Sequence, residues 1–227
     1  MSAGGSKAGD GCSMSRGDRK IDIAVLASGS GTNLEAIARA IDDGEVPARI
    51  ALVLSDNPDA FALERARKRG IPTRVILLSD YPDRPSYDKA IVEALEEAGV
   101  DLVVLAGYMK LAGPEFVRAF KGRIMNIHPA LLPSFAGTHG VREALEHGAK
   151  VSGVTVHFVD EGLDTGPIIV QEAVPVEEGD DEETLHNRIH QAEYRQYPKA
   201  VRLFAEGRLE IDGRKVRIIP GSTGERG

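Results

Sequence analysis

The sequence has 227 residues, of which 42% are hydrophobic and 28% charged, and its formal net charge is −7 at pH 7. No run of about 18 apolar residues occurs, which excludes a transmembrane helix on length. The acidic balance argues against general nucleic-acid binding, because that function needs a concentrated basic surface.

Residues 1–20 are rich in Gly and Ser and lack the apolar core of a secretory signal, so we expect a disordered tail. Deleting residues 1–18 should therefore leave activity and melting temperature nearly unchanged. The only cysteine, Cys12, lies in this tail, so no disulfide can form within one chain. A reducing, cytoplasmic setting fits this cysteine usage.

From Ile21 the chain alternates strand-like and helix-like segments. Apolar, β-branched runs predict strands at 21–27, 49–55, 73–78, 102–106 and 124–128. Helical periodicity and end signals predict helices at about 34–41, 60–70, 86–98 and 114–120. Because this alternation is typical of parallel sheets with right-handed crossovers, we expect an α/β, Rossmann-like, mostly parallel twisted sheet with flanking helices.

The pattern changes after the strand at 124–128. A helix at 141–147 precedes strands at 151–159 and 168–176, which are close enough in sequence to form an antiparallel pair. Helices at 182–192 and from Pro198 to Gly207 follow, and then a short hairpin at 209–219. Because we find no repeat and no linker, we expect a single domain over residues 21–219 and a flexible C-terminus over residues 220–227.

A glycine-rich loop, Ser28-Gly-Ser-Gly-Thr-Asn33, lies between the first strand and the first helix. Glycines let a backbone approach a ligand closely, and the N–H groups at a helix start attract anions. Thr32 and Glu35 have the spacing of a capping box, which also indicates a helix start. A dinucleotide site with Asp56 as the ribose acid is a competing interpretation, but Leu34 stands where the third glycine would be. We therefore favour a single terminal phosphate, with a purely structural turn as the alternative.

Asn126 and His128 end the strand at 124–128, directly before Pro129. Residues two apart in a strand lie on the same face, so both side chains should point to one side. An amide beside an imidazole can hold a developing oxyanion and move a proton. For Asn-x-His alone, the structural alternative is a capping Asn followed by a turn His.

Asp164 lies in a glycine-flanked loop between the strands at 151–159 and 168–176. A carboxylate beside an imidazole orients it and favours its protonated form. With Asn126 and His128, Asp164 completes a set suited to acyl transfer onto an amine. The sequence has no core cysteine and no Gly-x-Ser-x-Gly elbow, so direct attack by the substrate's own amine is favoured over a covalent enzyme intermediate.

Six motifs, in one order, resemble the folate-dependent phosphoribosylglycinamide formyltransferases of purine biosynthesis. They are Ser28-Gly-Ser-Gly-Thr-Asn-Leu34, Leu105-Ala-Gly-Tyr-Met109, Asn126-Ile-His-Pro-Ala-Leu-Leu-Pro133, Gly153-Val-Thr-Val-His-Phe-Val159, Asp164-Thr-Gly-Pro167 and Glu193-Tyr-Arg-Gln-Tyr-Pro198. The resemblance covers about residues 21–207. It implies the formyltransferase fold and transfer of a formyl group from 10-formyltetrahydrofolate to the amine of glycinamide ribonucleotide. It also implies small-molecule substrates, no metal, and a monomer or homodimer.

The resemblance also implies roles for individual residues, with Asn126, His128 and Asp164 as the catalytic trio. The ribonucleotide would be bound by Gly29, Ser30, Gly31, Thr32, Asn33 and Glu193. The folate would be bound by Arg84, Met109, Lys110, Leu111, Ala112, Phe116, Val117, Asn126, Val159, Asp160, Glu161, Gly162, Leu163 and Asp164. His139 and His157 are further candidates near the site, whereas we expect His147, His186 and His190 to be solvated helix residues. Lys110 and Ala112 depart from the family pattern, which usually has Arg and a larger apolar residue there.

Two related enzymes share the Asn-x-His…Asp core, namely methionyl-tRNA formyltransferase and formyltetrahydrofolate deformylase. The first typically carries an additional C-terminal domain and the second an N-terminal regulatory domain. We expect neither of these additional domains outside residues 21–207. Neither relation explains the glycine-rich loop paired with Glu193. Outside enzymes, the alternative is a Rossmann-type nucleotide-binding module that uses Gly29, Gly31 and Asp56.

Overall fold

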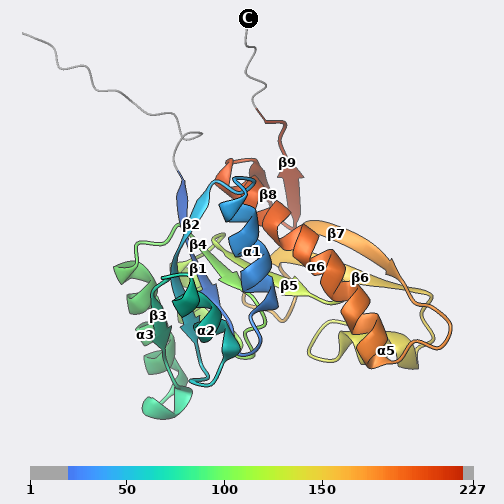
Figure 1. Cartoon of the computed structure of the whole chain (residues 1–227), viewed down its shortest axis with the longest axis horizontal. Helices are drawn as coiled ribbons and strands as arrows, with labels where there is room; N and C mark the ends of the chain where they lie inside the picture. The colour runs from blue at the N-terminus through green and yellow to red at the C-terminus, as the bar shows by residue number, and fades with distance from the viewer. Residues whose placement is uncertain (1–19, 222–227) are drawn as a thin grey trace, which may run out of the picture.

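The computed structural model describes residues 20–221, and it arranges them around a nine-stranded sheet with the order β3-β2-β1-β4-β5-β6-β7-β9-β8 (Figure 1). Helices cover both faces of this sheet, which confirms the predicted α/β fold with its mostly parallel first half. Of the predicted tail at 1–20, residues 1–19 lie outside the described part of the chain, and so do residues 222–227 of the predicted C-terminal segment at 220–227. Within residues 20–221, no helix is long and apolar enough to cross a membrane.

The strands follow the predicted order. The five parallel strands are β1 (Ile21–Leu26), β2 (Ala48–Ser55), β3 (Thr73–Val75), β4 (Leu102–Leu105) and β5 (Ile124–His128). The antiparallel strands β6 (Val151–Phe158) and β7 (Ile168–Pro175) extend the sheet beyond β5, as predicted. The hairpin of β8 (Leu209–Asp212) and β9 (Lys215–Ile218) closes this edge, where β9 pairs with β7.

The helices divide between two cores on opposite faces of the sheet. The helices α1 (Thr32–Asp42), α2 (Phe61–Lys68) and α6 (Glu182–Ala205) contribute to the first core. The helices α3 (Arg84–Glu97) and α4 (Pro114–Ala119) contribute to the second, while α5 (Gly140–Glu146) adds to the first core beyond β5. A short 3-10 helix, Leu78–Asp80, follows β3.

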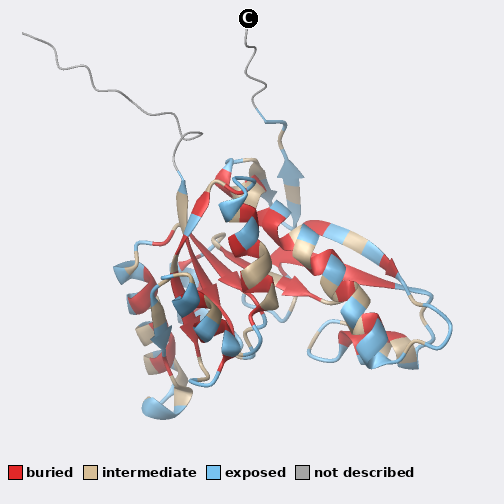
Figure 2. Ribbon diagram, viewed as in Figure 1, coloured by how far each residue is buried: buried red, intermediate tan, exposed pale blue. Residues whose placement is uncertain are grey.

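The continuous apolar runs in the central strands follow from this double covering. In β1, Ile23 and Val25 point into the first core, whereas Ala24 and Leu26 point into the second. Both sets are fully buried, and Figure 2 shows the central strands buried along most of their length. A strand covered on both faces has no solvent side that would select polar residues.

The polar loops gather at the carboxyl end of the parallel strands. Leu26, the last residue of β1, pairs with Leu105, and Leu105 pairs with Asn126. The loops that follow β1 and β4 therefore emerge beside the end of β5. Open α/β sheets bind their ligands at this end of the strands.

One predicted helix boundary is wrong. We expected a new helix to begin at Pro198, but α6 is continuous from Glu182 to Ala205 with Pro198 inside it. The proline removes one backbone donor, but its neighbour Tyr197 is fully buried and donates its hydroxyl to the carbonyls of Leu105 and Met125. Ala200 and Val201, after the proline, are also buried in the first core, so tertiary contacts on both sides of Pro198 hold the helix together across it.

Two local predictions at element ends also differ from the structure. The strand predicted at 73–78 stops at Val75, residues 76 and 77 are irregular, and the 3-10 helix begins at Leu78. Helix α1 does begin at Thr32, but no capping box forms there. Its N-cap is Gly31, and the Glu35 side chain instead pairs with Arg69 at 2.7 Å.

Candidate active site

A cleft of about 530 Å³ opens where β1, β4 and β5 end. Five backbone segments line it, and they are 29–33, 105–112, 126–129, 137–138 and 159–164. Helix α6 closes one side with His186, His190 and Glu193. A larger groove of about 650 Å³ lies between α1 and α6, but it includes none of the predicted catalytic residues.

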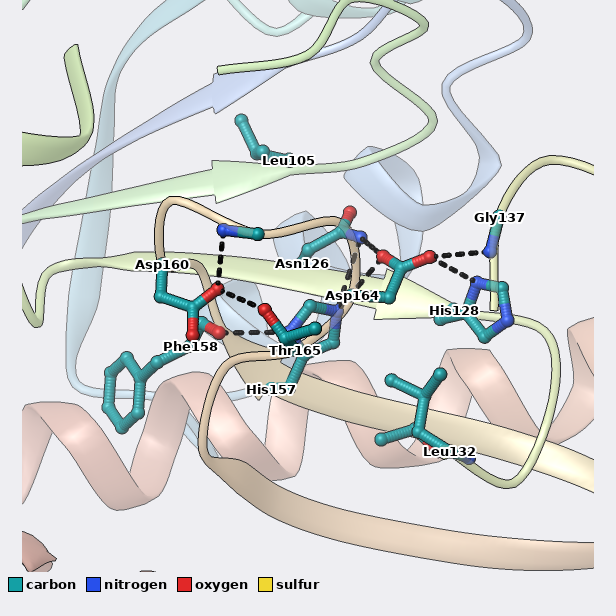
Figure 3. A network of polar contacts seen from close by, with 12 residues as sticks. Leu105, Asn126, His128, Leu132, Gly137, His157, Phe158, Asp160, Asp164 and Thr165 are labelled. Atoms are coloured by element: carbon teal, nitrogen blue, oxygen red, sulfur yellow. Dashed lines mark hydrogen bonds and ion pairs between the residues drawn. The ribbon is translucent and has the colours of Figure 1, made fainter. Parts of the chain in front are cut away.

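Asp164 lies at the centre of the polar groups in this cleft (Figure 3). Its Oδ2 accepts a hydrogen bond of 2.9 Å from the Gly137 N–H and lies 3.5 Å from Nδ1 of His128. Its Oδ1 lies 3.5 Å from Nδ2 of Asn126 and 3.5 Å from Nε2 of His157. The structure therefore brings together the three residues predicted to be catalytic, and it adds His157 to them.

The protonation of His128 is set by its two nitrogen partners. Nε2 lies 2.7 Å from the Phe135 carbonyl, which can only accept, so Nε2 carries the proton and Nδ1 faces Asp164. Burial lowers the pKa of His128, and this effect outweighs the opposing charge of Asp164 and the bond to the Phe135 carbonyl. The expectation that Asp164 keeps His128 protonated is therefore wrong for the free protein, because desolvation of the imidazolium is the larger effect.

Asp164 itself stays ionised. Burial raises its pKa, but bonds from His157 and the Gly137 N–H, together with the nearby imidazoles, outweigh burial and lower the pKa below its usual range. His157 is oriented by its Nδ1, which lies 2.9 Å from the Phe158 carbonyl. Its Nε2 lies between Nδ2 of Asn126, at 3.4 Å, and Oδ1 of Asp164, at 3.5 Å.

The loop that carries Asp164 has a constrained backbone. Asp164 has a φ of 52°, in the left-handed region that aspartate tolerates better than most residues. Asp160 holds the turn before it, because its Oδ1 accepts bonds from the Gly162 N–H and the Thr165 hydroxyl (Figure 3). A Cβ at Gly166 would lie 1.8 Å from the Phe158 carbonyl oxygen, so only glycine fits there. Backbone geometry thus fixes the direction of the Asp164 carboxylate.

A second buried polar pair joins α1 to α6 across the cleft. Nδ2 of Asn33 donates to Oε2 of Glu193 at 2.8 Å, and Glu193 is only 4% exposed. Burial raises the pKa of Glu193, while the bond from Asn33 opposes this shift. Nε2 of His190 lies 3.9 Å from the same oxygen, and the rings of His186 and His190 are 4.1 Å apart.

The expectation of solvated histidines at 186 and 190 is therefore wrong. Both are half-buried at the wall of the cleft, whereas His147 is exposed, as expected. The spacing i, i+4, i+7 of His186, His190 and Glu193 places them on one helical face, and that signal was present in the sequence. Among residues 20–221, no three His, Cys, Asp or Glu side chains converge as metal ligands.

The structure does not bring every predicted residue to the cleft. The predicted residues that line it are Gly29, Ser30, Gly31, Thr32, Asn33, Met109, Lys110, Leu111, Ala112, Asn126, His128, His157, Val159, Asp160, Glu161, Gly162, Leu163, Asp164 and Glu193. Four others are not part of the lining. Phe116 and Val117 are buried residues of α4, Arg84 pairs with Asp88 at 2.8 Å, and His139 is exposed before α5. The cleft is also lined by residues that were not predicted as site residues, namely Leu105, Ala106, Gly107, Tyr108, Ile127, Pro129, Gly137 and Thr138.

Comparison with known proteins places this cleft in a family. The formyl transferase family model matches residues 21–201. The phosphoribosylglycinamide formyltransferase of Escherichia coli is 42% identical over 191 residues, which are 84% of this chain and 90% of that protein. The crystal structure of glycinamide ribonucleotide transformylase 1 from Symbiobacterium toebii matches with a TM-score of 0.87 and 55% identity, over 88% of this chain and 95% of that one.

A longer relative is also similar. The trifunctional purine biosynthetic protein adenosine-3 of Drosophila pseudoobscura is 51% identical over 189 residues, which are 82% of this chain but only 14% of that protein. The chain thus spans about one seventh of the length of this relative. The family match covers most of the sheet and all the segments that line the cleft. The chain therefore belongs to the formyl transferase family.

Proposed function

We propose that this protein transfers the formyl group of 10-formyltetrahydrofolate to the amine of glycinamide ribonucleotide in de novo purine biosynthesis. The products would be formylglycinamide ribonucleotide and tetrahydrofolate. The observation that carries this proposal is that a single cleft contains a glycine-rich helix start and the Asn126, His128 and Asp164 group. A ribonucleotide phosphate fits the first feature, and acyl transfer to an amine fits the second.

The ribonucleotide is assigned to the α1 side of the cleft. Its phosphate would bind to the backbone N–H groups of residues 29–33, where the start of α1 adds a partial positive charge. Glu193 would contact the ribose or the glycinamide group. The bond between Asn33 and Glu193 supports this assignment, because it ties the two ends of the ribonucleotide site together.

The folate is assigned to the loops after β4 and β6. Met109, Leu111 and Leu163 are 73%, 66% and 51% exposed at this cleft, although each is a large apolar side chain. A flat aromatic ring system would cover such side chains and remove them from water. Nζ of Lys110 lies 3.8 Å from Asp56, so its charge is already partly balanced. We assign no direct contact to the four predicted residues outside the lining.

The reaction follows from the charges at the site. The ribonucleotide amine attacks the formyl carbon, which gives a tetrahedral species with a negative oxygen and a positive nitrogen. Asn126 donates to that oxygen, and the long contacts of its Nδ2 to Asp164 and His157 leave this amide free to turn. Ionised Asp164 accepts the proton of the nitrogen. That proton, relayed through Asp164 and Nδ1 of His128, reaches the folate nitrogen as the carbon–nitrogen bond to it breaks.

Donor consumption with different acceptors tests this function. We expect rapid consumption of formyl-folate with glycinamide ribonucleotide as the acceptor and none without an acceptor. Consumption with the dephosphorylated form of this acceptor should be much slower. Equal consumption without any acceptor would instead identify a deformylase, and transfer to methionyl-tRNA would identify the other related enzyme.

A charge placed in the glycine-rich loop tests the phosphate assignment. Ser30 is exposed, so Ser30→Asp should fold and should raise the KM for the ribonucleotide at least about tenfold by charge repulsion. The KM for the folate should hardly change. Ser79→Asp, at an exposed position in the 3-10 helix, is the matched control. Equal damage to both KM values would count against a phosphate site in this loop.

A cytoplasmic location and a monomeric or homodimeric state are also proposed, from the sequence alone. Light scattering during size-exclusion chromatography measures the second directly, and a larger assembly would contradict it.

A further inference from the structure

The glycine-rich loop is held, on the side away from the cleft, by α2 and by the turn that precedes this helix. Three consecutive carbonyl groups, those of residues 28, 29 and 30, each accept a hydrogen bond from these two segments. The donors are Nδ2 of Asn57 at 3.1 Å, the N–H of Ala62 at 3.0 Å and Nε of Arg65 at 2.9 Å. The third is a charged donor, and such bonds are stronger than neutral ones.

This arrangement decides which backbone groups face the cleft. A peptide unit is planar and trans, so a carbonyl that points one way turns the next residue's N–H the opposite way. The bond from Arg65 to the carbonyl of Ser30 therefore turns the Gly31 N–H away from α2. The same argument applies to the two preceding peptide units. An anion in the cleft thus meets N–H groups, while the carbonyl oxygens, which would repel it, are occupied elsewhere.

The side chain of Arg65 is itself held in place. Its guanidinium lies 4.9 Å from the centre of the Phe61 ring, and its NH1 lies 3.8 Å from the Glu35 carboxylate. Glu35 is fixed in turn by Arg69 at 2.7 Å. The loop also packs tightly on α2, because a Cβ at Gly31 would lie 2.7 Å from the Cα of Ala62. Arg65 is therefore ordered before any ligand binds.

We propose that Arg65 is a positioning residue for the ribonucleotide phosphate, which it orients through the Ser30 carbonyl without touching the phosphate. The inference rests on the proposed phosphate site. It explains why a partly exposed arginine of α2 has its side chain directed at a loop carbonyl.

The test compares two arginines on one helix. Arg65→Met keeps an unbranched stem over Phe61 and removes every donor, while Arg67→Met changes an exposed side chain on α2 that does not contact the loop. We expect Arg65→Met to raise the KM for the ribonucleotide about tenfold, since a hydrogen bond to a charged group is lost. The kcat and the KM for the folate should change less than about twofold. Arg65→Lys should recover part of the loss, and Arg67→Met should behave as the parent protein.

The outcomes separate this inference from the phosphate assignment. If Ser30→Asp raises the KM for the ribonucleotide and Arg65→Met does not, the phosphate site stands and the role of Arg65 is wrong. If neither variant raises it, the phosphate assignment fails as well. If Arg65→Met raises both KM values equally and lowers the melting temperature, Arg65 is merely structural and the inference is overturned.

Discussion

Asp164 makes one short hydrogen bond, to the Gly137 N–H, and three contacts of 3.5 Å. The short bond fixes the carboxylate, whereas the three long contacts leave its lone pairs available to a substrate proton. Catalytic hydrogen bonds are often long before substrate binds and shorten in the reacting complex. The free site is therefore ready to react but not yet closed.

Replacing this carboxylate by an amide should remove most of the turnover without unfolding the protein. Asp164→Asn keeps the shape and an oxygen for the Gly137 N–H, but it removes the proton acceptor and the charge beside His128. We expect kcat to fall by on the order of 10²–10⁴, the usual contribution of a general acid–base group, with substrate affinities within a few-fold. Steady-state kinetics and binding titrations measure both, with Asp59→Asn, an exposed aspartate outside the cleft, as the control.

The same reasoning predicts that the trio acts as a unit. Asn126→Ala and His128→Ala should each be impaired to a similar extent, and the double variants should lose clearly less than the sum of the single losses. Near-normal kcat in folded Asp164→Asn would remove Asp164 from the mechanism.

The neighbouring histidines of α6, His186 and His190, predict how stability depends on pH. Burial lowers the pKa of both His186 and His190, so the folded protein binds their protons less readily than the unfolded chain does. Their neutral forms favour folding above the unfolded value of 6.5, and this stability is lost as the pH falls below 6.5 toward the lowered folded values. The melting temperature should therefore fall between about pH 7 and pH 5.

Matched variants isolate this effect. Glu193, whose pKa is raised, changes the stability in the opposite direction. Its contribution to stability is present below the unfolded pKa of 4.5 and is lost as the pH rises through the folded pKa. The groups that face the two rings also include Glu182 and Tyr194. The double variant His186→Gln/His190→Gln should flatten the decline, and exposed His147→Gln should not. An unchanged slope in the double variant would contradict the burial argument.

At the scale of the element, α6 joins the sheet to the site. The same helix that carries Glu193 into the cleft places Tyr197, one turn later, with its hydroxyl 2.8 Å and 3.0 Å from carbonyls of β4 and β5. This single hydroxyl therefore fixes the helix against the strands that end at the catalytic residues. It also accounts for a helix that tolerates an internal proline.

Removing that hydroxyl should cost stability but little activity. Tyr197→Phe leaves the buried ring in place, and we expect it to lower the free energy of unfolding by about 1–2 kcal/mol. For a chain of this size, the melting temperature should fall by roughly 2–4 °C for each kcal/mol. Tyr194→Phe, on the same helix but without a hydroxyl hydrogen bond in the structure, is the control. A melting temperature equal to that of the control would show that the two carbonyls do not need this donor.

The sequence predicted the elements that depend on local pattern and missed those that depend on distant contacts. The runs at 21–27 and 102–106 are apolar because both faces are buried, so their character is visible without a fold. The continuity of α6 across Pro198 depends on partners about 70 to 90 residues away in sequence, which no window around the proline contains. In the same way, the neutral state of His128 depends on burial, which the Asn-x-His spacing does not encode.

At the scale of the whole molecule, the cleft is assembled from both ends of the chain. Asn33 and Glu193 are 160 residues apart in sequence, yet they share a buried hydrogen bond. The two cores also share the strands of one sheet, because alternate residues of β1 belong to each. If either core lost its packing, one face of these shared strands would be exposed, and the strands that support the other core would be destabilised.

We therefore predict one cooperative unfolding transition that shifts with ligand. At a ribonucleotide concentration 100 times its Kd, the folded state should gain about 2.7 kcal/mol. Scanning calorimetry should show a single peak that moves to higher temperature, and Ser30→Asp should reduce this shift. Two resolved peaks, of which only one responds to the ribonucleotide, would contradict a site that spans the sheet.

The most direct test of direct formyl transfer in this cleft is the fate of the formyl carbon in a single turnover. Excess protein is mixed with 10-formyltetrahydrofolate labelled in its formyl group and with glycinamide ribonucleotide, and the reaction is then quenched in acid. The account predicts one labelled formylglycinamide ribonucleotide for each tetrahydrofolate formed, with no label on the protein and none released as formate. Label recovered as formate, or bound covalently to the protein, would contradict it.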